Sequence, residues 1–478
     1  MSKFNTTIKK APITNLAGGK AYSQSKELEL LSILLTSFVD DSFYRSSSDT
    51  LDRLRSLIND VDPLFAAKSA IFARDKFGMR SISHVMASEL ASKISGQDWA
   101  KDFYDKIIVR LDDMTEIVSY YLNNNTDKTK PKFPNSMKKG FASAFDRYTG
   151  YHIAKYKGDG KEVKLVDIVN LVHPIPNEGN SEALSALIKG TLKNTDTWES
   201  KLSQAGQSVE SDVDQLKSNV WRDLLESKKI GYFAALRNIK NILNQAPDQI
   251  DNLCNILTNE DMIKSSRVLP FRFNTAFGEI QKLGSSKEVR KILVAIDNAL
   301  GISTNNVPKL EGDTLVVIDV SGSMAGRPAE ISSIFGSILA KSNNCDVMTF
   351  DRDARYVNYN PNDSIMTIKN SFRFNGGGTN FHSIFQKANR KYDSIVILSD
   401  CQGWIGRHNP TDAFNEYKKN YDCDPYVYSW DMKGYGSLQF PEKKVFCIAG
   451  FSEKVFDLMS SLKEDRQTMV NKIKLTQI

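Results

Sequence analysis

Residues 1–300 repeat their apolar positions with the period of an α-helix. In the stretch 26–38, Leu28, Leu31 and Leu35 are spaced to lie on one helical face, and Phe38 continues it. The same spacing predicts helices at 49–58, 62–77, 81–94, 114–122, 135–148, 162–172, 181–192, 220–229, 232–244 and 286–300. The turn sequences between them are short, and neither a heptad pattern nor a repeat of fixed length is present. These features predict helical pairs stacked as a solenoid.

The pattern changes after residue 305, where short β-rich apolar runs alternate with helical stretches. The runs lie at 314–321, 345–350, 354–359, 394–400, 425–430 and 444–450, and the helical stretches at 329–342, 379–392, 411–421 and 453–465. Alternation of this kind predicts a mostly parallel, doubly wound α/β sheet. Because residues 300–312 form a polar linker, we expect two domains, at 1–305 and 306–478.

The chain has 478 residues, of which 41% are hydrophobic and 25% are charged, and this composition excludes a collagen-like or disordered protein. Its five cysteines form no CxxC pair, so we interpret them as reduced intracellular thiols. The first ten residues lack the apolar stretch of a signal peptide, and no apolar run approaches the length of a membrane span. We expect a cytoplasmic protein that does not interact with membranes.

Charge is distributed unevenly between the two predicted domains. The formal net charge is +6, from 63 Lys and Arg residues against 57 Asp and Glu residues. From residue 311 to the end the two signs are equal in number, so the whole excess lies in residues 1–310. An excess of this size is mild, and a nucleic-acid surface would therefore have to be a local patch.

The end of the first predicted strand carries oxygen ligands for a cation. Asp319, Ser321 and Ser323 are separated by single residues, and the glycine between the two serines permits a turn that brings the three side chains together. Thr379 follows three glycines at a predicted helix start, and Asp400 ends the strand at 394–400. Ligands of open α/β sheets bind outside the carboxyl ends of the strands. Hydroxyl and carboxylate oxygens suit Mg²⁺, Mn²⁺ or Ca²⁺, of which we expect Mg²⁺ first.

These positions lie in the segments DVSGS, GGGTNF and LSDCQG, which in this order resemble the metal-ion-dependent adhesion site of von Willebrand factor A domains. The resemblance covers residues 312–478 and includes all five positions. It implies a Rossmann-like domain whose bound cation keeps one coordination position open for a partner's carboxylate. We identify neither a catalytic base nor a second set of metal ligands beside these five positions, so we predict no catalytic residues. His382 and His408 are isolated and are interpreted as surface residues.

Segments of the first half resemble the TROVE module of the Ro autoantigen family, in its compact bacterial and phage form. They read NLAGGKAYSQSKELELLSILLTSF, DSFYRSSSDTLDRLRSLI, AIFARDKFGMRSISHV, AKYKGDGKEVKLVDIVNLVHPIP and GYFAALRNIKNI. The resemblance spans residues 15–300 and implies a ring of HEAT-like helical repeats that the von Willebrand factor A domain closes. It also implies binding of Y RNAs and of the single-stranded 3′ ends of misfolded noncoding RNAs, and thus RNA quality control.

Residues 128–173 have the composition of a sequence-tolerant RNA surface. Acidic residues are sparse, and the cations are Lys130, Lys132, Lys138, Lys139, Arg147, Lys155, Lys157, Lys161 and Lys164. The interleaved aromatic residues are Phe133, Phe141, Phe145, Tyr148, Tyr151 and Tyr156. Cations neutralise phosphates and flat rings stack on bases, although we expect Phe141 and Phe145 in the helical core.

The family resemblance implies two particular contacts in this region. Lys155 and His173 match the positions that help to hold Y RNA on the outer face of the ring. Asp159 stands where the family pattern has a second basic residue, so we expect Lys157 or Lys161 to replace it.

A second basic group lies between two predicted helices and contains Arg74, Lys76 and Arg80. If the helices line a ring, this edge would meet a single strand that enters the hole. Capping of a helix C-terminus explains Arg74 and Lys76 equally well.

Three classes of function follow from these observations. The first is a monomeric ribonucleoprotein scaffold that binds Y-like small noncoding RNA and misfolded RNA 3′ ends and docks a protein, such as an exoribonuclease, at its metal site. The second is a metal-dependent RNA-processing enzyme, and the third is a protein-only adaptor. The missing catalytic base disfavours the enzyme and the basic segment 128–164 disfavours the adaptor, so we predict the RNA-binding scaffold.

Overall fold

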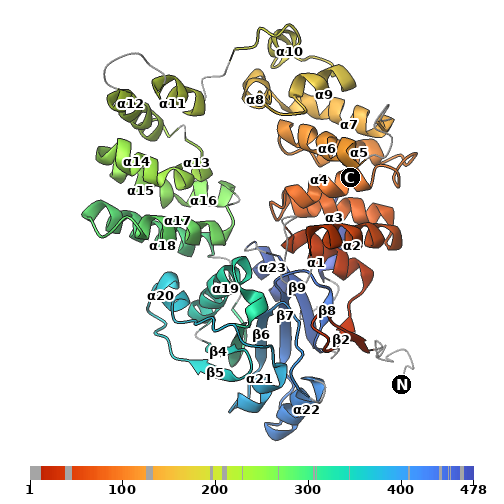
Figure 1. Ribbon diagram of the computed structural model, residues 1–478, viewed down its shortest axis with the longest axis vertical. Helices are drawn as coiled ribbons and strands as arrows, with labels where there is room; N and C mark the ends of the chain where they lie inside the picture. Colours follow the sequence, from red (N-terminus) through yellow and green to blue (C-terminus); the bar gives the residue numbers. More distant parts are fainter. Residues whose placement is uncertain are drawn as a thin grey trace. The chain divides into compact units, whose positions relative to one another are not determined.

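The computed structural model describes residues 12–37, 46–124, 133–193, 198–206, 213–228, 230–266, 268–304, 307, 309–343, 345–406, 410–440, 444–450, 452, 454–462 and 468–478 (Figure 1). The chain forms two compact units. One unit comprises Met1–Arg53, Gly231–Lys240 and Ile250–Asn471, and the other comprises Leu54–Ile230, Asn241–Gln249 and Lys472–Ile478. The two units are not contiguous in sequence, because residues 1–53, 231–240 and 250–303 group with the α/β sheet, and the expected domains 1–305 and 306–478 stay a prediction.

The second unit is built from short helices that pack in sequence order. Its helices are α3 (Pro63–Asp75), α4 (Ser81–Glu89), α5 (Ala100–Lys106), α6 (Leu111–Asn124), α7 (Asn135–Ala144), η1 (Phe145–Arg147), α8 (Gly150–Lys155), α9 (Leu165–Val172), α10 (Ser181–Ile188), α11 (Trp198–Gly206), α12 (Val213–Glu226) and η2 (Pro247–Gln249). Figure 1 shows α3 to α10 as successive layers, in which α4 packs on α6, α5 on α7 and α9 on α10. The predicted stacking of helical pairs is therefore confirmed, whereas closure of the helices into a ring stays a prediction.

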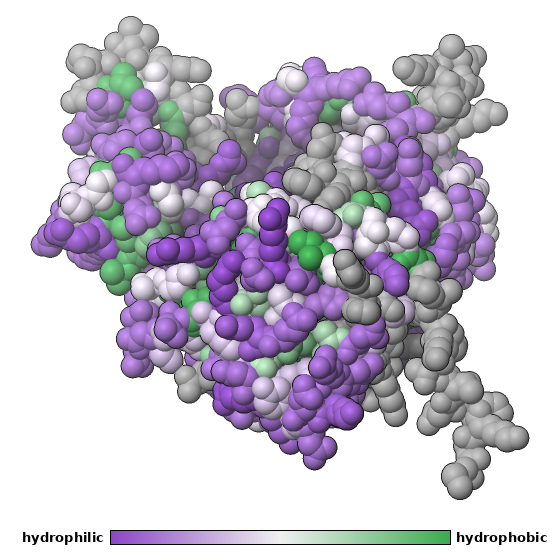
Figure 2. Space-filling view, turned by 60° about the horizontal axis from the view of Figure 1, so that its bottom comes forward, coloured by the Kyte–Doolittle hydropathy of each residue, from purple (hydrophilic) through white to green (hydrophobic). Residues whose placement is uncertain are grey.

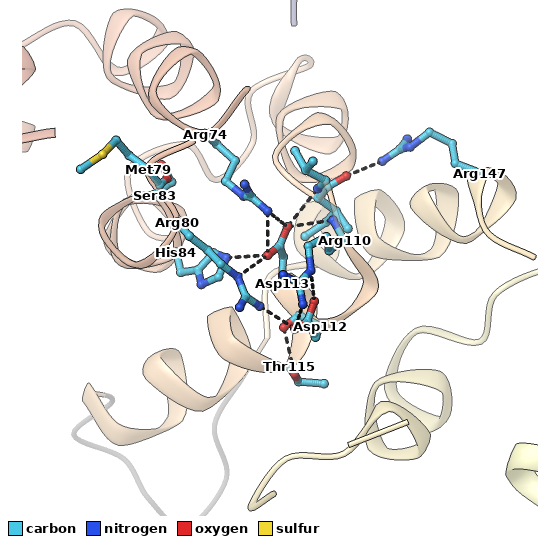
Figure 3. A network of polar contacts seen from close by, with 12 residues as sticks. Arg74, Met79, Arg80, Ser83, His84, Arg110, Asp112, Asp113, Thr115 and Arg147 are labelled. Carbon is cyan, nitrogen blue, oxygen red and sulfur yellow. Dashed lines mark hydrogen bonds and ion pairs between the residues drawn. The ribbon is translucent and has the colours of Figure 1, made fainter. Parts of the chain in front are cut away.

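A buried carboxylate joins three of these helices (Figure 3). Asp113 of α6 is fully buried and accepts hydrogen bonds from Arg74 Nη2 at 2.9 Å, Arg80 Nε at 3.0 Å and His84 Nε2 at 2.9 Å. Its Oδ2 also accepts from the backbone N–H of Val109. Burial raises the pKa of Asp113, but the hydrogen bond from His84 and the charges of the two arginines outweigh burial and hold this pKa well below its usual range.

The first unit contains a second group of helices beside the sheet. They are α1 (Lys26–Thr36), α13 (Tyr232–Arg237), α15 (Ile250–Leu257), α16 (Glu260–Ser266), α17 (Pro270–Gln281) and α18 (Lys287–Ser303), while α2 (Ser47–Asp60), α14 (Ile239–Gln245) and α24 (Thr468–Lys474) contain residues of both units. The side chains of Ser25 and Ser286 accept the first free N–H groups of α1 and α18 and so fix where these helices begin.

The α/β part has the predicted doubly wound topology. Its strands are β3 (Thr314–Asp319), β4 (Asp346–Phe350), β5 (Ala354–Val357), β6 (Ser394–Ser399), β7 (Tyr426–Asp431) and β9 (Val445–Ala449). They lie in the order β5-β4-β3-β6-β7-β9, and β5 alone of the six is antiparallel to its neighbour. The short β1 (Pro12–Thr14) and β2 (Lys20–Ser23) pair with β8 (Ser437–Leu438) in a separate antiparallel sheet that the sequence pattern did not predict.

Helices cover both faces of the six-stranded sheet (Figure 1). The helices of this part are η3 (Gly322–Met324), α19 (Arg327–Asn343), α20 (Ile365–Lys369), α21 (Phe381–Lys387), α22 (Pro410–Asn420) and α23 (Lys454–Leu462), of which α20 packs on α19. On one face, Phe385 and Phe414 of α21 and α22 pack with Leu315 and Val317 of β3. On the other, the ring of Phe335 in α19 lies 4.7 Å from that of Trp430. Because β3 is buried on both faces, its residues are almost continuously apolar.

The surface in the view of Figure 2 is mostly hydrophilic, with hydrophobic residues in small separate groups. Among the helices of the described ranges, none is both long enough and apolar enough to cross a membrane.

We expect Asp113→Asn to destabilise the protein at pH 7 by about 3–5 kcal/mol, because it leaves Arg74 buried without its counter-charge. The lowered pKa of Asp113 means that this contribution is present above the unfolded pKa of about 3.9 and is lost only as pH falls further, through the folded pKa. The difference in urea midpoint between wild type and variant should therefore be constant from pH 5 to 8 and shrink in stronger acid. Asp102→Asn, which changes a half-exposed carboxylate on α5, is the control and should change stability little. Equal midpoints for the two variants would contradict the role given to Asp113.

Candidate metal centre and nucleic-acid interface

The loop after β3 brings three of the predicted metal ligands together. Asp319 ends the central strand, and its Oδ1 accepts the backbone N–H of Ser321 at 2.9 Å. The hydroxyl oxygens of Ser321 and Ser323 are 3.3 Å apart. A hydroxyl from the neighbouring strand, Ser399 Oγ, donates to Asp319 Oδ2 at 2.5 Å and fixes the carboxylate plane. Ser399 was not predicted from the sequence, although its place at the end of β6 was a signal.

Two further segments supply the remaining predicted ligands. Ser321 forms a parallel bridge with Gly377, whose carbonyl accepts the N–H of Gly322 at 2.9 Å, so the loop that carries Thr379 lies beside the loop after β3. Asp400 follows β6, the strand that pairs with β3, and therefore lies at the same sheet edge as Asp319. Thr379 and Asp400 are buried, as are the three ligands after β3. The structure therefore gathers all five predicted positions.

The electrostatics of this cluster fit a hard cation. Burial, and then the charge of Asp400, raise the pKa of Asp319 to about 7, and burial also raises the pKa of Asp400. Asp400 Oδ2 is buried and has no hydrogen-bond partner among the described residues. Two buried carboxylates side by side, one with an oxygen left open, are costly unless a cation joins them. A divalent ion held by Asp319, Asp400 and the three hydroxyls would neutralise both charges and could polarise an oxygen ligand from a partner.

The cluster is built of two carboxylates and hydroxyls, and this composition sets it apart from sites rich in nitrogen or sulfur. Over the described parts of the chain, no group of three or more His, Cys, Asp or Glu residues is arranged to hold a metal. His382 was expected at the surface, but this prediction is wrong: its side chain is only 8% exposed, because α21 packs it into the domain beside Gly406. His408 lies outside the described residues.

The loop that carries Asp400 is held by the amino-terminal hairpin β1–β2. Asn15 Nδ2 donates to the carbonyl of Gly403 at 2.8 Å, and Gln402 Oε1 accepts the N–H of Leu16 at 2.8 Å. Gln402 Nε2 in turn donates to Ser437 Oγ of β8, which pairs with β2. This network was not predicted from the sequence, because its partners are almost 400 residues apart.

The predicted RNA-contact residues of α7 remain available at the surface. Lys138 is half-buried and Lys139 is exposed, and neither forms an ion pair with any described residue. Phe141 and Phe145 are fully buried, which confirms that they are core residues. Lys130 and Lys132 fall outside the described ranges.

The other predicted cations differ in how far acidic neighbours neutralise them. Arg147 pairs with Asp105, Lys157 with Asp159 at 2.6 Å and Lys161 with Glu116 at 2.6 Å. Pairing of this kind consumes charge that Lys157 or Lys161 would need in order to replace the basic residue missing at Asp159. The predictions for these residues stay untested, but the structure leaves them with less free charge than Lys138 and Lys139.

Lys155 stands among aromatic rings. Its Nζ lies 5.6 Å from the ring centre of Tyr151, which is 47% exposed, and 5.8 Å from that of Tyr156. The guanidinium of Arg110, a residue the sequence analysis missed, lies 4.9 Å from the Tyr156 ring. Arg110 also pairs with Asp112 at 2.9 Å, so this group offers flat rings and the charge of Lys155 to an RNA strand.

His173 ends α9 in the left-handed conformation, with φ 46° and ψ 64°, and its side chain is exposed. Its backbone N–H donates to the carbonyl of Val169 and closes the helix. The imidazole is therefore presented outward by a backbone geometry that a non-glycine residue seldom adopts.

Arg74 and Arg80 belong to the Asp113 network (Figure 3). Arg74 is 7% exposed and is bound to Asp113, so the structure gives it a role in joining α3 to α6. Arg80 is partly exposed and pairs with both Asp112 and Asp113. Lys76 pairs with Asp75 at the end of α3. The RNA contact predicted for Arg74 and Arg80 stays a prediction.

Two protein-family models match this chain, one in its helical part and one in its α/β part. Residues 179–308 match the TROVE domain, and residues 314–463 match the Ro60 vWA domain. This chain combines a TROVE domain with a Ro60 vWA domain. The TROVE and Ro family is a family of RNA-binding proteins. Both predicted resemblances are thus confirmed, while the RNA-contact residues proposed between 74 and 173 precede the matched part of the TROVE domain.

One solved structure shares the fold of this chain, and two curated proteins are similar to it in sequence. The structure is similar to the crystal structure of the Deinococcus radiodurans Ro (RSR) protein, with a TM-score of 0.60 and 16% identity over 92% of this chain and 100% of that one. Telomerase protein component 1 of Rattus norvegicus is 18% identical over 370 residues, 57% of this chain, and that of Mus musculus is 19% identical over 346 residues, 54% of this chain. The chain spans only 14% and 13% of the length of these two relatives.

We expect Asp319→Ala to abolish divalent-cation binding by the Ro60 vWA domain. A bound ion stabilises the folded state by RT ln(1 + [L]/Kd), about 2.7 kcal/mol at one hundred times Kd. Addition of Mg²⁺ or Mn²⁺ should therefore raise the melting temperature of wild type but not of this variant. Asp424→Ala changes an exposed carboxylate that precedes β7, at the other end of the strands, and should respond like wild type. An equal metal response of all three proteins would place the cation elsewhere.

Proposed function

We propose that this protein is an RNA-binding ribonucleoprotein scaffold. In this proposal it binds Y-like small noncoding RNAs and the single-stranded 3′ ends of misfolded noncoding RNAs, and so serves RNA quality control in the cytoplasm. The observation that carries the proposal is the presence of a TROVE domain and a Ro60 vWA domain on one chain. The lysines of α7, which have no acidic partner among the described residues, support it because they can neutralise phosphates.

The metal centre serves protein docking in this proposal. Five oxygen ligands from the protein leave a divalent ion one position for a carboxylate of a partner, such as an exoribonuclease. The site lies in the part of the chain that has no net charge, whereas the excess of basic residues lies in residues 1–310. RNA binding and protein docking therefore depend on separate groups of residues.

Purification of the native protein with and without nuclease tests the proposal directly. Untreated protein should carry RNA, measured as absorbance at 260 nm, and sequencing of that RNA should identify small structured noncoding species. A protein that carries no RNA in either preparation would be an adaptor. Cleavage of the bound RNA in Mg²⁺ or Mn²⁺ that disappears in Asp319→Ala would make it an enzyme.

Lys138→Ala combined with Lys139→Ala should weaken binding of several RNAs to a similar extent. Each lost phosphate contact removes about 0.7–0.9 from the slope of log affinity against log salt, so the salt dependence should also become flatter. Lys418 and Lys419 of α22 show the same pattern of one half-buried and one exposed lysine, and their double alanine variant is the matched control. An unchanged slope in the α7 variant would move the RNA site away from α7.

His173→Ala should weaken a structured Y-like RNA by about fivefold, the loss of roughly one hydrogen bond, and change binding of a single-stranded 3′ tail little. His173→Asn is the informative companion, because asparagine tolerates the left-handed backbone and removes only the imidazole. The asparagine variant should show the same RNA defect at an unchanged melting temperature. If both RNAs are weakened equally and the melting temperature falls, His173 has only a helix-ending role.

A further inference from the structure

A cavity of about 540 Å³ opens between α13 and α17, inside the matched TROVE domain. Leu236 and Ile280, both almost fully buried, belong to its lining. Phe233, Arg237, Lys240 and Arg272 also line it. Every lining residue belongs to the first unit, whereas Lys138 and Lys139 belong to the second. Its volume is in the range of cavities that bind small ligands.

The aromatic ring of Phe233 lines the cavity and is not buried in the protein core. Phe233 is 44% exposed, although large apolar side chains on a short helix are normally turned inward, as those of Tyr232 and Leu236 are. The guanidinium of Arg272 lies 6.0 Å from the centre of this ring and 4.9 Å from that of Phe271. A flat ring with a cation near it can receive another planar group by stacking.

The cavity also concentrates positive charge. Arg237 and Arg272 form no ion pair with any described residue, and Lys240 lies on the same wall. Burial lowers the pKa of Arg272, and the nearby charges of Arg327 and Arg237 lower it further, so these guanidinium groups repel one another. Glu279 is the one acidic residue among the described residues that line the cavity, and it pairs with Lys282 at 2.6 Å. Repulsion within this cluster of like charges destabilises the folded protein, and a bound anion would reduce that repulsion.

We propose that this cavity binds one nucleotide of single-stranded RNA, with the base stacked on Phe233 and its phosphate held by Arg237 and Arg272. The inference rests on the proposed RNA-binding function and gives it a second site, which serves single strands and not folded RNA. The carboxylates of an acidic peptide would satisfy the arginines but offer no base to stack on Phe233. A nucleotide uses both the ring and the charges, and sequence-tolerant sites for single strands combine these two features.

The test compares binding of a fluorescent uridine ten-mer and of a structured Y-like RNA, followed by fluorescence anisotropy over a range of salt concentrations. Phe233→Leu should weaken the ten-mer by about tenfold, within the roughly 5- to 150-fold that stacking of one base on an aromatic ring contributes, and should leave the salt slope unchanged. Phe233→Tyr keeps the ring and should bind like wild type. Arg272→Gln should weaken the ten-mer and flatten the slope by about 0.7, the loss of one phosphate contact on a single strand.

Controls separate this inference from the proposed function. Arg290→Gln removes an exposed arginine of α18 in the same unit and should leave the ten-mer affinity unchanged. The structured RNA should bind all cavity variants like wild type. A ten-mer containing 4-thiouridine should crosslink in wild-type protein to the peptide that carries Phe233, a readout that needs no variant to fold.

Three results would overturn the inference. Wild type that binds the structured RNA, with ten-mer affinity unaffected by Phe233→Leu and Arg272→Gln, would refute the cavity site and leave the proposed function intact. Displacement of the fluorescent ten-mer by poly-glutamate at lower concentration than by unlabelled ten-mer would show that the cavity prefers acidic protein segments. Wild type that binds neither RNA would refute the proposed function and, with it, the nucleotide site.

Discussion

The free-energy cost of a buried carboxylate governs both units of this protein. In the helical unit, Asp113 is fully buried, and two arginines, a histidine and two backbone N–H groups satisfy it. In the sheet unit, Asp319 and Asp400 are equally buried, but the hydrogen bonds to Asp319 come from neutral hydroxyl and backbone donors, and Asp400 Oδ2 has no hydrogen-bond partner among the described residues. The same physical constraint therefore gives an ion-pair network that holds helices together at Asp113 and a candidate cation site at Asp319 and Asp400.

Ion pairing also separates structural from available cations in the helical unit. Arg74 is committed to Asp113, and Lys161 is bound to Glu116 on α6. Lys138 and Lys139 have no such partner among the described residues, and the Phe233 cavity likewise holds Arg237 and Arg272 without an acid of their own. Charge that the fold does not neutralise is the charge that remains for RNA phosphates.

The metal loop depends on residues from the other end of the chain. Asn15 and the backbone of Leu16 bond to Gly403 and Gln402, and β2 pairs with β8, whose Ser437 bonds to the same glutamine. A close approach of backbones makes this contact possible: a Cβ on Gly19 would overlap the carbonyl oxygen of Gly403. The amino-terminal hairpin is thus a structural part of the unit that contains the Ro60 vWA domain.

The sequence by itself predicted most of the helices, the parallel strands and the gathering of the five proposed metal ligands at one sheet edge, because helical and strand periods are local and because carboxyl ends of parallel strands share one edge. Helices such as α11, α16 and α17 lie outside the predicted ranges. Only the tertiary structure decided that His382 is buried, that Arg74 forms an ion pair with Asp113 and that Phe233 lines a cavity. These outcomes depend on partners far away along the chain: Arg74 and Asp113 are 39 residues apart, and Asn15 and Gly403 are 388 residues apart. Local periodicity places a side chain on a face of its own helix or strand, but which charge or ring meets that face is settled by packing.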